Sequence, residues 1–243
     1  MTAGEVHPFD PGGAGELPGT LPIFPLSGAL LLPGGRLPLN VFEPRYLRMV
    51  EAALAGNRMI GMVQPLAVEE PEAAAFAAQL GHEAPGGEDA GNGPVFRVGC
   101  VGRIVAFSET DDGRFLITLR GVARFDVGEE LAMRDGYRRV RPVFRGYEAD
   151  LERQAPSLDR ERLLTALTAY FERQGIDADW DTIKTAPDAH LVTSLAMVCP
   201  FSVTEKQALL EEPDSTARAR AMTSMLEMAI LGGESAPGSS RRQ

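Results

Sequence analysis

Lysine is almost absent from this chain of 243 residues, since Lys184 and Lys206 are the only lysines among 24 basic residues. No glycine-rich segment precedes either of them, so the GxxxxGK[ST] loop with which P-loop ATPases hold phosphate is missing. The HExxH motif of zinc peptidases and the GxSxG motif of serine hydrolases are missing as well. A Ser–Lys pair would need a desolvated lysine beside an exposed serine, whereas both lysines are expected to be ordinary solvated side chains. The sequence therefore predicts no catalytic residue and no enzymatic activity.

Cysteine and histidine are also scarce. Cys100 and Cys199 lie far apart, and neither has another cysteine or a histidine close to it in the sequence. This spacing excludes a CxxC metal or redox site, and His7, His82 and His190 are isolated from one another. We therefore expect two reduced thiols, no metal site and no cofactor, as is common in cytoplasmic proteins.

Long apolar runs are missing too. No run approaches the roughly 20 residues that a membrane-spanning helix needs. The first twenty residues contain no Lys or Arg and no apolar core of a secretory signal. The cytoplasm is therefore the expected location. Hydrophobic residues still make up 44% of the chain, which is enough for a buried core.

The chain is acidic overall, and its charged residues are unevenly distributed along the sequence. The net charge is -10, and the segment 66–93 contains several acids and no base. The segment 95–145 is different, because it is rich in arginine. An acidic chain is a poor general binder of nucleic acid, but the arginine-rich segment 95–145 keeps RNA binding open as an alternative function.

Strand patterns dominate residues 21–147. Asp112-Gly113 is typical of a tight hairpin turn, and Gly121 is expected to separate two strands. A helix is expected to begin at Pro44, because proline suits the first helical position, and to end at Gly56. The acidic insertion 66–94 is expected to be flexible, with a helix allowed over 71–80. The expected strands, short and rich in apolar or β-branched residues, are 21–26, 37–42, 59–63, 95–108, 114–119, 122–127 and 137–147.

Helical patterns dominate residues 148–231. Ser157 is expected to cap the first helix and Asp188 the second. The sequence from Ser202 to Glu205 is a capping box that opens a third, and a fourth is expected over 214–231. The segment around Lys184 is expected to be a polar turn.

Strands followed by helices indicate an α+β fold, an antiparallel β-barrel followed by a C-terminal helical bundle. The expected organisation is a disordered tail over 1–20, a barrel domain over 21–147, a helical bundle over 148–231 and a tail over 232–243.

Two blocks of the sequence resemble the N-terminal, substrate-binding domain of Lon proteases. The first is LPIFPLSGALLLPGGRLPLNVFEPRY over 21–46, with the run from Phe42 to Tyr46 as its end. The second comprises VGCVGRI over 98–104, GRF over 113–115 and LRGVARF over 119–125. The resemblance implies a PUA-like β-barrel with a helical portion. In full-length Lon this region helps to select client proteins ahead of an ATPase and a protease domain, and the resemblance leads us to expect that this chain ends where those domains would begin.

The function expected from this resemblance is a non-enzymatic polypeptide-binding module that lacks ATPase and peptidase domains. Its partners would be unfolded or client polypeptides, or a separate Lon protease, and not a membrane. The alternative is an RNA-binding PUA-like module that uses segment 95–145.

Candidate contact residues come from an apolar run beside a turn, formed by Leu30, Leu31 and Leu32. In a strand, Leu30 and Leu32 would face one side and Leu31 the other. Either the C-terminal helices cover this run, through Met222 and Met225, or part of it stays open and receives clients. Methionines would suit varied partners, because their side chains are flexible and polarizable.

Overall fold

The structure, a computed structural model, describes residues 17–66, 93–152 and 155–232. The chain divides into two compact units. The first contains the described residues up to 152 together with 197–211, and the second contains 155–196 and 212–232. Most of the expected tails and of the insertion 66–94, including its helix over 71–80, lies outside the described residues.

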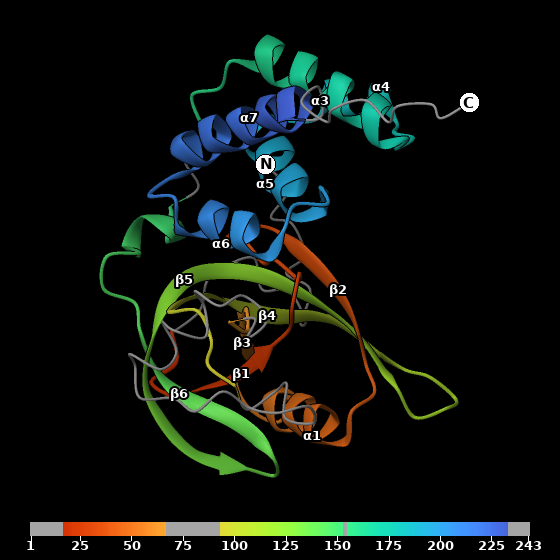
Figure 1. The fold of residues 1–243 in the computed structure, drawn as a ribbon. Coiled ribbons are helices and arrows are strands. Elements are labelled where there is room, and N and C mark those ends of the chain that lie inside the picture. The colour runs from red at the N-terminus through yellow and green to blue at the C-terminus, as the bar shows by residue number, and fades with distance from the viewer. Residues whose placement is uncertain (1–16, 67–92, 153–154, 233–243) are drawn as a thin grey trace, which may run out of the picture. The chain divides into compact units, whose positions relative to one another are not determined.

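Six strands form one sheet in the first unit, and their pairings lead around a ring. The order is β2-β5-β4-β3-β1-β6, and β6 also pairs with β5. β5 is long enough for both roles, because Phe115–Asp126 pairs with β4 and Asp126–Arg134 with β6. The result is the curved, barrel-like sheet of Figure 1, with β2 attached outside the ring. The strands are β1 (Leu21–Pro25), β2 (Arg36–Val41), β3 (Met59–Val63), β4 (Val98–Glu109), β5 (Phe115–Arg134) and β6 (Tyr137–Val143).

The α+β class is confirmed, but the expectation of a purely antiparallel sheet is wrong for one pair. β1 and β3 are parallel, with Ile23 opposite Gly61. Parallel neighbours need a crossover connection of a dozen or more residues, usually with a helix. Helix α1 (Pro44–Leu54) lies in this connection and begins with Pro44, as the sequence predicts.

Gly121 does not separate two strands, because β5 runs through it without a break. A Cβ atom at this position would lie 2.0 Å from the carbonyl oxygen of Leu32. The Gly121 carbonyl also accepts a hydrogen bond from the Gly34 amide at 2.9 Å. The glycine is therefore needed for the close approach of segment 32–35 to β5, and not for a turn.

Leu30, Leu31 and Leu32 lie in an irregular segment between β1 and β2, and not in a strand. All three are buried, with exposed fractions of 2%, 1% and 0%. The side chain of Leu31 lies over β4, since a Cβ atom at Gly102 would be 2.6 Å from its Cδ2. The two-sided alternation of a strand is therefore absent from this run.

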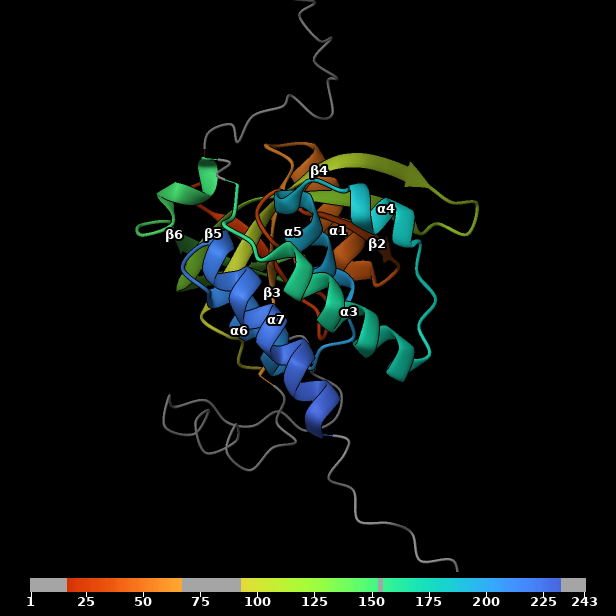
Figure 2. The ribbon, with the colours of Figure 1, turned by 90° about the horizontal axis from the view of Figure 1, so that it is seen from above.

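The second unit is helical. α3 (Arg160–Gln174) and α7 (Ser215–Gly232) lie side by side in Figure 2, and Arg162 forms an ion pair with Glu227 at 2.7 Å. The cap of α3 is Asp159, which accepts a hydrogen bond from the Arg162 amide, and not Ser157. The expected polar turn around Lys184 is a short helix, α4 (Trp180–Thr185).

α5 (Asp188–Val198) begins in the second unit and ends in the first. Asp188, the expected cap, is its first helical residue.

α6 (Val203–Glu211) belongs to the first unit, although its sequence lies among the other helices. Its predicted capping box is confirmed. The Glu205 amide donates to Ser202 Oγ at 3.2 Å, and the Ser202 amide donates to Glu205 Oε2 at 2.8 Å. Figure 1 shows α6 above the strands of the first unit and α1 below them.

Candidate functional site

Three exposed apolar side chains lie near the β4–β5 turn, where β2, β5 and β4 run together, two of them on one side of the sheet and one on the other. They are Phe42, Phe107 and Leu116, with exposed fractions of 61%, 36% and 44%. Figure 1 shows this β4–β5 hairpin extending beyond the ring of strands. Large apolar side chains that gather at one place on a surface commonly mark an interaction site.

The strand register shows which side chains share a face. Asn40 lies opposite Leu116, and Leu116 lies opposite Ser108. Directly opposite residues of antiparallel strands point to the same side of a sheet. We call this side the outer face. Its members are Arg36, Pro38, Asn40 and Phe42 along β2 and just after it, Arg114, Leu116, Thr118 and Arg120 along and just before β5, and Arg103, Ala106 and Ser108 on β4.

The opposite side of the same strands is core. Phe115, Ile117 and Leu119 have exposed fractions of 7%, 2% and 0%. Phe107 is on this side at the edge of the core, where its ring packs edge-on against Phe115 with centroids 5.1 Å apart. The hairpin therefore exposes apolar surface on both of its sides.

The end of the hairpin is well defined by polar contacts. Gly113 has a positive φ of 79°, in keeping with the turn predicted at Asp112-Gly113. Arg114 forms an ion pair with Asp112 at 2.8 Å, and its guanidinium carbon lies 5.8 Å from the centre of the Phe42 ring. This cation–π contact holds Phe42 over the outer face while leaving most of the ring exposed.

β2 is an edge strand, because within the described chain it pairs with β5 alone. Pro38 sits in the middle of β2 and has no N–H to offer to a further strand. Proline at an edge discourages the addition of strands. Contacts with another polypeptide would therefore be made by the side chains of the outer face.

The candidate residues predicted from the sequence lie elsewhere. Leu30, Leu31 and Leu32 are in the interior of the first unit, and Met222 is buried in the second. Met225, also on α7, is half-buried. The leucine run is therefore covered, and a client could reach it only after local opening; cover by Met222 and Met225 stays a prediction. Binding by these five residues stays a prediction.

The expectation of two solvated lysines is correct for Lys184 and wrong for Lys206. Lys184 is exposed. Lys206 is buried, and its Nζ donates a hydrogen bond of 2.7 Å to the Gly28 carbonyl. Desolvation lowers the pKa of Lys206, but the amine is used to tie α6 to the segment after β1. Burial raises the pKa of the nearby Cys199 to about 12, so that its thiol stays protonated.

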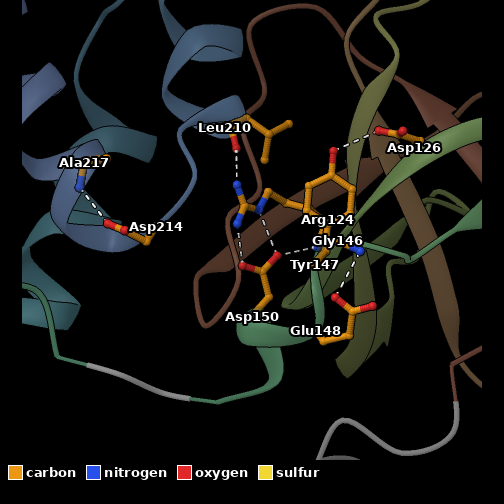
Figure 3. A network of polar contacts seen from close by, with 9 residues as sticks. All are labelled: Arg124, Asp126, Gly146, Tyr147, Glu148, Asp150, Leu210, Asp214 and Ala217. Atoms are coloured by element: carbon orange, nitrogen blue, oxygen red, sulfur yellow. Dashed lines mark hydrogen bonds and ion pairs between the residues drawn. The ribbon is translucent and has the colours of Figure 1, made fainter.

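The arginine-rich segment contains a buried ion pair that sequence analysis missed. The Arg124 guanidinium donates to both carboxylate oxygens of Asp150 at 2.8 Å, and the Arg124 amide donates to the same group at 2.9 Å (Figure 3). A further bond of 3.4 Å reaches the Leu210 carbonyl on α6. Tyr147 lies beneath the Arg124 guanidinium, and its hydroxyl donates a hydrogen bond to Asp126. Burial is the larger cause, and this hydrogen bond the second, that raises the pKa of Tyr147 to about 12. The network is structural, because it joins β5, the short 3-10 helix η1 (Glu148–Leu151) and α6.

No group of three or more metal-ligating side chains occurs within the ranges that the structure describes. In the same ranges, no helix combines the length and the apolar character needed to cross a membrane.

Comparison with known proteins assigns the fold to a family. The profile of the ATP-dependent protease La (LON) substrate-binding domain matches residues 20–228. The Lon protease of Anaeromyxobacter dehalogenans strain 2CP-C is 25% identical over 214 residues, which are 87% of this chain and 23% of that protein. Lon protease 2 of Myxococcus xanthus is also 25% identical, over 87% of this chain and 24% of its own length. The chain thus spans about a quarter of the length of these relatives.

Two solved structures have the same fold. The Lon N-terminal domain protein from Xanthomonas campestris has a TM-score of 0.53 at 23% identity, covering 84% of this chain and 97% of that one. The N-terminal domain of Mycobacterium avium complex Lon protease has a TM-score of 0.51 at 15% identity, covering 86% and 98%. With a profile match over most of its length, the chain belongs to the family of Lon substrate-binding domains.

Proposed function

We propose that this protein is a non-enzymatic polypeptide-binding module that recognises unfolded or client polypeptides through the apolar end of the outer face. The observation that carries the proposal is a pair of exposed apolar side chains on one side of the sheet, Phe42 just after β2 and Leu116 on the protruding β4–β5 hairpin. Membership of a family described as substrate-binding supports the class of ligand.

The geometry of the hairpin suits this task. Leu116 is exposed on a paired, three-stranded framework, and Phe42 follows β2 directly and contacts Arg114, so both lose little conformational freedom when a client binds. Apolar side chains recognise exposed apolar segments without demanding one sequence, which is what a binder of varied unfolded chains needs. We further propose that the protein works in the cytoplasm, alone or with a separate Lon protease to which it presents clients.

The RNA-binding alternative receives less support from the structure. Within the described part of the chain, at least six of the ten arginines in segment 95–145 form ion pairs with carboxylates. Arg124 is buried in one of these pairs, and Arg139 donates to the Ala132 carbonyl. A phosphate backbone would have to displace these partners. The paired arginines are Arg97, Arg114, Arg124, Arg134, Arg138 and Arg141.

Substitution of the exposed apolar side chains tests the proposal. The double variant Phe42→Ser and Leu116→Ser should weaken binding to a permanently unfolded model protein, such as reduced and alkylated α-lactalbumin, by at least about tenfold, because two apolar contacts are lost. Binding would be followed by fluorescence anisotropy.

The matched control is Met228→Ser and Leu231→Ser, which removes two exposed apolar side chains from α7 in the second unit. Both double variants should melt within about 3 °C of the parent, because exposed substitutions change stability little. Equal binding by the parent and the Phe42/Leu116 variant would exclude the outer face as the client site.

A further inference from the structure

The end of the β4–β5 hairpin, residues 107–116, carries more negative than positive charge. Its acids are Glu109, Asp111 and Asp112, and its only base is Arg114. Arg114 is paired with Asp112 at 2.8 Å, so these two charges largely cancel. Glu109 and Asp111 are exposed, and in the part of the chain that the structure describes neither carboxylate forms an ion pair. Two carboxylates without a cation therefore remain beside the exposed apolar side chains.

The other charges near this end do not offset them. Glu43, which follows Phe42, is paired with Arg45 at 2.9 Å, so this pair adds no net charge. The arginines of the outer face that lie farther from the turn each interact with other groups of the chain, and they are Arg36, Arg103 and Arg120. The charge that a client meets at the hairpin end is thus negative, with the same sign as the net charge of -10 of the whole chain.

We propose that the hairpin end prefers client segments in which an apolar residue is accompanied by a lysine or arginine a few positions away. The inference rests on the proposed function and specifies its ligand. The apolar side chain of the client would contact Phe42 and Leu116, and its cationic side chain would reach Asp111 at the turn. Glu109 adds negative charge from the other side of β4. Complementary charge of this kind selects among ligands that share the same apolar contact.

The spacing follows from strand geometry. Thr110 lies opposite Arg114, because the Thr110 amide donates a hydrogen bond of 2.9 Å to the Arg114 carbonyl. Asp111 is one residue farther toward the turn, so it lies about three residues from Leu116, or ~10 Å at ~3.4 Å per residue. An extended client covers this distance in about three residues, and the flexible lysine stem tolerates about one residue more or less. The preferred client therefore has its basic residue about two to four positions from the apolar one.

Two electrostatic effects act in the same direction on such a client. The net negative charge of the chain attracts basic segments before contact, although salt limits its range to about 8 Å at physiological ionic strength. The carboxylates of the hairpin end act once the client is bound. The first effect depends on the total charge and the second on two particular residues, so variants of equal net charge can separate them.

Three short fluorescein-labelled peptides test the inference on the full chain. They share one apolar centre, Leu-Phe-Leu, and carry Lys, Gln or Glu three positions to either side of its phenylalanine. The Lys peptide should bind about threefold tighter than the Gln peptide, the size expected of an exposed ion pair. The Glu peptide should bind most weakly. Binding would be followed by fluorescence anisotropy at physiological salt.

Two double variants with the same net charge locate the preference. Glu109→Gln with Asp111→Asn removes the carboxylates of the hairpin end and should reduce the preference for Lys over Gln to less than about 1.5-fold. Glu51→Gln with Glu172→Gln removes exposed carboxylates of α1 and α3 that likewise form no ion pair in the described part of the chain, and it should keep the preference. Should the first variant prove unstable on thermal melting, Asp111→Asn alone provides the comparison with Glu51→Gln.

The outcomes separate the inference from the proposed function. Equal binding of the Lys and Gln peptides, or tightest binding of the Glu peptide, overturns the charge preference and leaves polypeptide binding intact. A Lys preference of the same size in both double variants also overturns it, because the net charge of the chain would then be its source. If none of the peptides binds but reduced and alkylated α-lactalbumin does, the inference fails and the proposed function stands. If that protein does not bind either, both fail.

Discussion

Arg124 and Asp150 show how a single residue pair can hold distant segments together. Their side chains are 3% and 9% exposed, and Asp150 satisfies the amide as well as the guanidinium of Arg124. A buried charge that loses its partner costs far more than an exposed one, because water cannot replace the lost contacts. The stability of the first unit should therefore depend on Asp150.

Asp150→Ala should lower the free energy of unfolding by about 3–5 kcal/mol, since it leaves the Arg124 guanidinium buried without its carboxylate. Urea unfolding followed by circular dichroism measures the change. The control is Glu129→Ala, which breaks the exposed ion pair with Arg141 and should cost less than about 1 kcal/mol. Equal losses for the two variants would contradict a special role for the buried pair.

At the scale of elements, close contacts between backbone segments determine the arrangement of the strands as much as side-chain patterns do. β5 passes under segment 32–35 at Gly121, where the approach leaves no space for a side chain. The same segment carries the buried Leu30, Leu31 and Leu32. This crossing places β2 beside β5 and so builds the framework of the outer face.

Gly121→Ala should destabilise the first unit by at least about 2 kcal/mol, because its Cβ would overlap the Leu32 carbonyl and backbone has to move. Thermal unfolding measures the shift. Gly19→Ala, where an added Cβ meets nothing within 4 Å, is the matched control and should change stability by less than about 0.5 kcal/mol. If Gly121→Ala melted like the control, the close approach would not matter.

At the scale of the whole molecule, the two units differ in the elements and in the sequence segments from which they are built. The second unit is built from helices, whereas the first combines the strands with a helix that returns to it from far along the sequence. Side-chain hydrogen bonds tie this helix to the rest of the first unit: Gln64 to the Val203 carbonyl, Arg124 to the Leu210 carbonyl, Lys206 to the Gly28 carbonyl and Gln207 to the Val98 carbonyl. Buried polar side chains are thus used for assembly, and none of them forms a catalytic arrangement.

The proposed binding function predicts that the chain has no enzymatic activity. We expect the purified protein neither to hydrolyse ATP nor to cleave casein above background, because it has no phosphate-binding loop and Lys206 is engaged with a backbone carbonyl. Turnover that copurifies with the protein and disappears on a point substitution would contradict this expectation. The Lys206→Met variant is the natural first substitution to compare.

Local patterns by themselves determined much of this protein. Pro44 begins α1, Ser202 and Glu205 form the cap of α6, and Asp112-Gly113 turns between β4 and β5, as predicted. These features depend on neighbours in sequence, through backbone angles and hydrogen bonds that span a few residues. The order of strands before helices likewise determined the α+β class, and the two motif blocks determined the family.

Only the tertiary structure decided which residues meet. Burial of Lys206 and Leu31, the pairing of Arg124 with Asp150 and the place of α6 in the first unit all depend on contacts between distant segments. An apolar run looks the same in the sequence whether another segment covers it or not. For that reason the sequence left open whether the leucines are covered, and the structure places them in the interior, while Leu116, on the β4–β5 hairpin that extends beyond the barrel, and Phe42, just after β2, are exposed.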